Sequence, residues 1–265
     1  MRDYLYAVTL AHHSIFAITS LFVPCGATPS LWAFSVHNSV RELVMKKPLV
    51  IFGAGDIAQL AHFYFSSDSE YEVVAFTVDA AYLSGTTFCG LPVIAFENVT
   101  RHFTPDQCEI FVAFGYSKLN AVRKEKYLAA KALGYRLASF ISSKATVLNE
   151  GQIGENCFIF EDNTIQPFVT VGNNVILWSG NHIGHHSTIK DHCFIASHAV
   201  VSGRVNIGEQ CFIGVNATLR DHIKIGEKCV IGAGALLLAD AEPEGVYMGT
   251  ATDRSKVPST RLRGI

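Results

Sequence analysis

Residues 183–213 read IGHHSTIKDHCFIASHAVVSGRVNIGEQCFI. Every sixth residue of this stretch is aliphatic: Ile183, Ile189, Ile195, Val201, Ile207 and Ile213. The same spacing continues in both directions over residues 141–237 and makes seventeen consecutive hexads without an exception. Aliphatic residues fill only about a quarter of the positions in ordinary chains, so chance does not explain the run.

A period of six residues does not fit the turn of an α-helix. It is typical of a parallel β-solenoid, in which a short strand turns a corner every six residues. Three faces of six residues make a coil of 18, so the repeat predicts a solenoid of between five and six coils over residues 141–242, followed by a tail over 243–265.

Each position of the hexad has an expected role. The residue at the first position fills the interior, and the residue at the fifth must be small enough to fit the corner. Glycine is frequent at the second position, where we expect it to permit the backbone conformation of the turn. Four cysteines occupy fifth positions, and we interpret them as small core residues rather than ligands: Cys157, Cys193, Cys211 and Cys229.

A glycine motif follows the first apolar run after Met45. Residues 49–52 have the continuous hydrophobicity of a buried parallel strand, and residues 53–58, GAGDIA, lead from it into a helical stretch over 59–65. The free N–H groups at such a helix start favour an anion. With further strands expected at 71–77 and 109–114, the sequence predicts a Rossmann-like nucleotide-sugar-binding domain over residues 46–138. The alternative is a glycine loop that only closes a corner between strand and helix.

Composition and charge exclude several classes of protein. The chain has 265 residues, 49% of them hydrophobic and 17% charged, with a formal net charge of -2. A nucleic-acid-binding protein would need a basic face, which this balance does not provide. The seven cysteines do not form the paired spacings of a disulfide scaffold or a structural zinc site.

The first 44 residues differ from the rest. Residues 4–23 are uncharged and about long enough to cross a bilayer, although His12 and His13 lie near the middle of the stretch. Met45 opens MKKPLVIFGAG, which has the form of a natural start. We interpret residues 1–44 as an upstream extension, with a membrane anchor as the alternative. A cytoplasmic protein without membrane association is therefore expected.

The hexads and the glycine loop together resemble the hexapeptide-repeat, left-handed β-helix acyltransferases. More narrowly, the chain is similar to the bacterial sugar acyltransferases of the NeuD/PglD type, which join a small Rossmann-like domain to a β-helix. The resemblance covers about residues 46–256. It implies an α/β Rossmann-like domain followed by a left-handed parallel β-helix, a homotrimer, and acetyl-CoA as co-substrate with no bound cofactor.

The resemblance also implies a general base. In the family, a catalytic histidine in a repeat corner precedes an acidic residue, and the matching segment here is 185–191, HHSTIKD. His185 would take a proton from the attacking group while that group adds to the acetyl thioester. His186 replaces the acidic neighbour, so Asp191, a group from a neighbouring subunit, or His186 itself must hold the tautomer of the base.

Three sets of binding residues follow from the same resemblance. The nucleotide sugar is expected at the glycine loop and the strand ends, with Arg123 as the partner of the diphosphate: Gly53, Gly55, Asp56, Asp79, Gly115, Asn120 and Arg123. The acceptor is expected beside Trp178, Asn181 and His182, where Trp178 replaces an asparagine of some relatives. Acetyl-CoA is expected along Phe194, Gly203, Gly214 and Ala233.

These features predict an acetyl-CoA-dependent acyltransferase that acts on the amino group of a nucleotide-linked amino sugar for surface glycan synthesis. One alternative is O-acetylation of a sugar hydroxyl, as in sialic acid O-acetyltransferases. A second is a metal enzyme of the γ-carbonic-anhydrase type, because His186 and His222 stand two coils apart; no metal site is expected, however, because Arg204 lies between them. A third is a trimeric scaffold without catalysis.

Overall fold

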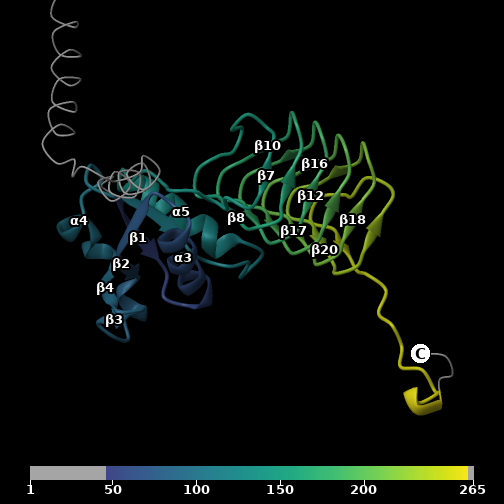
Figure 1. Ribbon diagram of the computed structural model, residues 1–265, viewed down its shortest axis with the longest axis horizontal. Helices are drawn as coiled ribbons and strands as arrows, with labels where there is room; N and C mark the ends of the chain where they lie inside the picture. Colours follow the sequence, from purple (N-terminus) through teal and green to yellow (C-terminus); the bar gives the residue numbers. More distant parts are fainter. Residues whose placement is uncertain (1–45, 262–265) are drawn as a thin grey trace, which may run out of the picture. The chain divides into compact units, whose positions relative to one another are not determined.

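The computed structural model describes residues 46–261, all within one compact unit, and the expected extension 1–44 lies outside them. The described chain is an α/β domain followed by a parallel β-solenoid (Figure 1). No helix in this part of the chain has both the length and the hydropathy needed to span a bilayer.

The α/β domain contains a sheet in the order β3-β4-β2-β1-β5, parallel except for β3. Alternate residues of β1 face opposite sides, so Leu49 and Ile51 pack toward α3 while Val50 and Phe52 pack toward α5. The predicted strands and the helix after the glycine loop are confirmed. In chain order the elements are β1 (Lys47–Phe52), α3 (Asp56–Ser67), β2 (Tyr71–Val78), η1 (Ala80–Tyr82), β3 (Thr87–Phe88), β4 (Leu91–Ala95), η2 (Phe96–Asn98), α4 (Val99–His102), β5 (Glu109–Val112) and α5 (Ala121–Ala132).

The solenoid has three faces, as predicted. Strands pair with the strand 18 residues further on, as Leu177 does with Ile195, except at the end of the first face, where Val230 pairs with Val246. The first face, sheet C, contains β6 (Phe140–Ile141), β8 (Phe158–Ile159), β11 (Ile176–Leu177), β14 (Phe194–Ile195), β17 (Phe212–Ile213), β20 (Val230–Ile231) and β22 (Val246–Tyr247). The second, sheet D, contains β7 (Thr146–Val147), β9 (Thr164–Ile165), β12 (His182–Ile183), β15 (Val200–Val201), β18 (Thr218–Leu219) and β21 (Leu236–Leu237). The third, sheet E, contains β10 (Thr170–Val171), β13 (Thr188–Ile189), β16 (Asn206–Ile207) and β19 (Lys224–Ile225).

The interior of the solenoid is filled by the first and fifth positions of the hexads. The four fifth-position cysteines are fully buried there without disulfide partners, which confirms their interpretation as core residues. Because β22 pairs with β20, the last coil reaches into the stretch expected as a tail. The short helix η3 (Ser259–Arg261) follows.

The glycines at the second position have a different physical role from the one expected. A Cβ at Gly184 would stand 2.6 Å from the backbone nitrogen of Gly203 in the next coil, and one at Gly208 would stand 2.6 Å from that of Glu227. Neither glycine has a positive φ angle. These positions therefore need glycine because successive coils stack closely. The left-handed turn lies at the fourth position and is occupied mostly by other residues, among them Asn174, His186, His192, His198 and His222.

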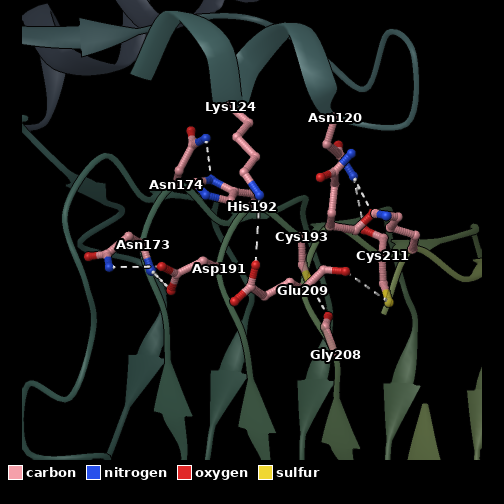
Figure 2. Close-up of polar contacts among 12 residues, drawn as sticks. Asn120, Lys124, Asn173, Asn174, Asp191, His192, Cys193, Gly208, Glu209 and Cys211 are labelled. Carbon is pink, nitrogen blue, oxygen red and sulfur yellow. Dashed lines mark hydrogen bonds and ion pairs between the residues drawn. The ribbon is translucent and has the colours of Figure 1, made fainter. Parts of the chain in front are cut away.

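Helix α5 docks on the solenoid through a column of these fourth-position residues (Figure 2). Asn156 donates to the Oδ1 of Asn174 at 2.8 Å, and the Nδ2 of Asn174 lies 2.9 Å from the Nδ1 of His192. Because Nδ2 can only donate, His192 Nδ1 must be an unprotonated acceptor. Burial lowers the pKa of His192 to about 4, the charges of Lys124 and Arg123 act in the same direction, and Asp191 opposes them.

We expect this histidine to make folding pH-dependent. The pKa of His192 in the folded protein, about 4, lies below its ordinary value of 6.5. Between these two pH values, His192 is therefore protonated in the unfolded chain but not in the folded protein. The free energy of unfolding should therefore fall by up to about 3 kcal/mol as pH drops from about 6.5 to about 4. His192→Asn keeps an acceptor in place of Nδ1 and should reduce this fall. Urea unfolding at both ends of the range measures the difference; equal losses in the two proteins would contradict the assignment.

Candidate active site

The candidate base His185 lies in an exposed corner of the solenoid, two residues after the end of β12. Its backbone N–H donates to Gln166 Oε1 at 2.8 Å, and its carbonyl accepts from the N–H of Arg204 at 2.9 Å. A Cβ at Gly203 would stand 2.8 Å from the His185 ring, so glycine at 203 makes room for the imidazole. The structure thus brings two of the predicted residues, His185 and Gly203, into direct contact.

The ring of His185 has one polar partner among the described residues. Its Nδ1 lies 3.1 Å from the Nδ1 of His186, and the two rings are nearly perpendicular. The pKa of His186 is below its usual value because its ring is partly shielded from water and because Arg204 and His185 are close. His185 Nε2 makes no hydrogen bond within residues 46–261, so this nitrogen is free to accept a proton from a substrate.

Asp191 does not orient the base within the protomer. Its carboxylate accepts from the backbone N–H of Asn173 at 2.8 Å and from the Nδ2 of Asn173 at 3.1 Å, one coil earlier. Asp191 therefore connects the corners of two successive coils. Of the candidates within the protomer for fixing the tautomer of His185, the structure leaves His186.

The glycine loop lies at the carboxyl ends of β1 and β5. Gly53 has a φ of 134°, and a Cβ there would stand 2.8 Å from the carbonyl oxygen of Ala113, so only glycine fits. Gly55, by contrast, precedes α3 without a side-chain cap, and a Cβ there would meet nothing within 4 Å. Asp56, the first residue of α3, is exposed. The first backbone N–H groups of this helix are therefore open to an anionic ligand.

Two other predicted residues flank this loop. Gly115 approaches Ile57 of α3, with 3.8 Å between a Cβ at 115 and Ile57 Cγ1. Asp79, directly after β2, is engaged by Lys126 at 2.9 Å, so a ribose at this position would have to share the carboxylate with the ammonium group. The sequence interpretation had not included this ion pair.

The predicted diphosphate role of Arg123 needs correction. The side chain is fully buried, and its five N–H donors meet five acceptors. Nε donates to the carbonyl of Asn174, Nη1 to the carbonyl of Gly115 and to Asn120 Oδ1, and Nη2 to the carbonyls of His192 and Cys193. No donor is left for a phosphate, so Arg123 connects α5 to the solenoid.

Asn120 has the same structural role as Arg123 (Figure 2). It is fully buried, and its Nδ2 donates to the carbonyls of Gln210 at 3.3 Å and Cys211 at 3.0 Å. Asn120 lies directly before α5 and has a left-handed backbone conformation, with a φ of 64°. Asn120 therefore anchors the helix on the coils and does not line an open ligand site.

The predicted acceptor residues separate into different places. Trp178 stacks on Phe160 with ring centroids 4.4 Å apart, in the aromatic cluster between sheet C and the α/β domain. Asn181 is buried: its Nδ2 donates to the carbonyl of Trp178, and its Oδ1 accepts from the N–H of Ala199 at 2.8 Å. Only His182 lies near His185. It is half-buried on β12, and His185 stands in the corner that follows this strand. Trp178 and Asn181 are thus structural residues of the coil.

The predicted acetyl-CoA residues also divide. Phe194 is buried against Tyr116, with ring centroids 5.0 Å apart, and is a packing residue. A Cβ at Gly214 would stand 2.6 Å from the backbone nitrogen of Ala233, so Gly214 serves coil stacking, whereas Ala233 is exposed. Gly203 alone among the four lies against His185.

The other histidines within the described residues do not assemble a metal site. Among residues 46–261, no three His, Cys, Asp or Glu side chains converge in a way that could hold a metal ion. Position four of the hexad explains His186, His192, His198 and His222, since histidine adopts the left-handed conformation more readily than most residues.

Two residues near the base were not singled out from the sequence. Gln166 accepts a hydrogen bond from the backbone of His185, and the ring of Phe168 contacts that of His186 in a tilted arrangement, with centroids 4.7 Å apart. The available signal was the 18-residue spacing, which places Phe168 one coil before His186 in the same corner column.

Comparison with known proteins supports the architecture. The bacterial transferase hexapeptide family (six repeats) matches residues 151–184, 171–203 and 204–239. No curated protein sequence matches the chain significantly. The acetyltransferase domain of PglB from Neisseria gonorrhoeae FA1090 is similar in structure, with a TM-score of 0.69 and 26% identity over 77% of this chain and 97% of that domain. The same domain in complex with acetyl coenzyme A gives a TM-score of 0.68 and 25% identity over the same shares of both chains.

Two further solved structures share the fold. Perosamine N-acetyltransferase from Caulobacter crescentus, in a complex of one of its point mutants with CoA and GDP-perosamine, has a TM-score of 0.69 and 22% identity over 76% of this chain and 93% of that one. WeeI from Acinetobacter baumannii AYE has a TM-score of 0.65 and 21% identity over 77% of this chain and 97% of that one.

Proposed function

We propose that this chain is an acyltransferase of the hexapeptide-repeat superfamily and that it transfers an acetyl group from acetyl-CoA to the amino group of a nucleotide-linked amino sugar. The observation that carries the proposal is the environment of His185. Its ring stands in an exposed corner, its Nδ1 is engaged by His186, and its Nε2 is free. This is the geometry of a general base that acts on an external substrate.

The proposed reaction is an acyl transfer with His185 as the base. The neutral amine of the sugar adds to the thioester carbonyl of acetyl-CoA, and His185 Nε2 takes the proton that the nitrogen loses. The tetrahedral intermediate then expels the CoA sulfur, which takes this proton from His185 and leaves as the thiol, so that the neutral base is restored. Gly203 leaves room beside His185, and the thioester would lie in this space.

The α/β domain would hold the nucleotide part of the acceptor. The open Gly55 turn and the free N–H groups at the start of α3 favour a diphosphate there, near Gly53, Asp56 and Gly115. Asn120 and Arg123 have no part in this site because their polar groups are engaged in the solenoid. The solved complex of perosamine N-acetyltransferase with GDP-perosamine is consistent with such an acceptor.

A homotrimer forms part of the proposal. Exposed apolar residues lie on, or directly after, three of the six strands of sheet D, namely Leu148, Val200, Leu236 and Leu238. A second copy of the chain that packs on this face would cover them and would approach the corner where β12 ends. Since acetyl-CoA and nucleotide sugars are cytoplasmic metabolites, we expect the reaction to take place in the cytoplasm, in a route to surface glycans.

Product analysis distinguishes this function from sugar O-acetylation. The full chain is incubated with acetyl-CoA and a panel of nucleotide-linked amino sugars, and the acetylated product is treated with mild base. An amide survives this treatment, so we expect the added acetyl group to remain. An acetyl group lost in mild base would show an ester and would replace the proposed N-acetylation with O-acetylation.

A further inference from the structure

The base of the proposed site has an uncharged partner. His185 and His186 contact each other through their Nδ1 atoms at 3.1 Å, so one nitrogen donates and the other accepts. For Nε2 of His185 to accept a proton from substrate, its Nδ1 must carry the hydrogen. His186 Nδ1 must then be the acceptor, with its own hydrogen on Nε2.

The ring of His186 is held in place from its other side. Phe168 stands one coil earlier in the same corner column, with its ring centroid 4.7 Å from that of His186 and an angle of 41° between the planes. Phe168 is 60% exposed and has a φ of 65°, a conformation that is rare for a bulky residue. The left-handed backbone is typical of the fourth hexad position, and the contact with His186 gives this exposed ring a partner.

We propose that His186 is a positioning residue, supported by Phe168, which keeps His185 in the Nδ1–H tautomer and thereby leaves Nε2 free as the base. The inference rests on the proposed function, because it takes His185 as the group that removes the substrate proton. It assigns to a neutral imidazole the orienting task that a carboxylate performs in other His-based sites.

The charges around the pair favour a neutral His186. The groups that face its ring are Arg204 in the next coil, His185 and the uncharged ring of Phe168. Shielding from water, Arg204 and His185 all lower the pKa of His186. The residue therefore stays an acceptor at neutral pH, including when His185 becomes an imidazolium during the reaction. A neutral partner stabilises that cation less than a carboxylate would, so a carboxylate at 186 should raise the pKa of His185.

Three substitutions at 186 separate these effects. In His186→Asn and His186→Asp, an oxygen takes the place of Nδ1, and both residues tolerate the left-handed backbone of this position. His186→Ala removes the contact altogether. His198→Ala is the matched control, because His198 occupies the same left-handed position two corners further along and is also exposed.

The direct readout is nitrogen NMR of the His185 ring in the full-length protein, which reports tautomer and pKa without turnover. We expect the Nδ1–H form in the wild type, in His186→Asn and in His198→Ala, and a mixture of tautomers in His186→Ala. His186→Asp should raise the pKa of His185 by about one unit or more. A predominantly Nε2–H ring in the wild type, or an unchanged ring in His186→Ala, would overturn the proposal.

Kinetics provide the second readout. We expect His186→Ala to lower kcat/KM about tenfold or more, and His186→Asn to restore most of that loss. In His186→Asp, the acidic limb of the kcat/KM profile should move to higher pH. If His186→Asn is as impaired as His186→Ala, the acceptor atom is not what matters and the inference fails. Absence of acetyl transfer by the wild type, with the expected NMR result, would remove the proposed function and leave the pairing of the two histidines established.

Discussion

Replacement of His185 by alanine is expected to lower kcat/KM for acetyl transfer by about a hundredfold or more. The reason is the loss of the group that removes the proton from the attacking amine, since the three atoms nearest to a Cβ at Gly203 all belong to the His185 ring. Stability should change little, because the side chain is exposed and its hydrogen bond to His186 lies at the surface.

The measurement is steady-state kinetics by thiol release, with acetyl-CoA binding and thermal unfolding measured on the same samples. The variant should still bind acetyl-CoA, because the imidazole acts on the acceptor. His198→Ala again serves as the control for loss of a corner histidine. Turnover of His185→Ala within a fewfold of the wild type would show that the base lies elsewhere, and His186 would then be examined first.

Replacement of Arg123 by methionine is expected to lower the free energy of unfolding by about 3 to 5 kcal/mol. The substitution keeps most of the side-chain volume but removes all five donors. Five acceptors in the boundary between α5 and the solenoid lose a partner, four of them backbone carbonyls from two separate parts of the chain. An unsatisfied buried acceptor costs roughly 1 to 3 kcal/mol, and partial relaxation reduces the sum.

Urea unfolding measures this loss, and Arg136→Met is the matched control. Arg136 is a largely exposed arginine whose Nε lies 3.6 Å from Glu109, so its replacement should cost less than about 1 kcal/mol. If Arg123→Met were no more destabilising than Arg136→Met, the side chain would not be a structural link between the domains. Its assignment as a diphosphate ligand would then have to be reconsidered.

The fold could be predicted because the hexad repeat is a local pattern with a single architectural solution. The preference for an aliphatic first position and a small fifth position depends only on the immediate surroundings of each residue, and both preferences were predicted correctly. The glycines at position two were assigned the wrong reason, because their constraint comes from a backbone 15 to 19 residues away, as with Gly184 and Gly203. Sequence spacing does not show how closely two coils approach.

Arg123 and Asn120 could not be placed correctly by resemblance alone. Their partners in the solenoid, from Asn174 to Cys211, follow 50 or more residues later and are backbone carbonyls, which carry no sequence signal. One signal did exist, since Arg123, Tyr127 and Ala130 form the buried stripe of α5. An arginine in such a stripe indicates buried hydrogen bonds rather than an exposed ligand contact.

The histidine cluster illustrates the same limit. His192 and His198 belong to the left-handed fourth position, so part of the cluster comes from backbone geometry rather than chemistry. What distinguishes His185 is that it stands at the third position of its hexad. That distinction needs the fold, because the third position becomes an exposed corner only when the coil is closed.

Thiol release from acetyl-CoA by the full-length chain, with and without a nucleotide-linked amino sugar, tests the central claim most directly. We predict release that depends on the acceptor, gives a product heavier by one acetyl group, and falls about a hundredfold or more in His185→Ala. The account would be contradicted if no amino-sugar nucleotide of the panel stimulated release, or if release proceeded equally well in His185→Ala.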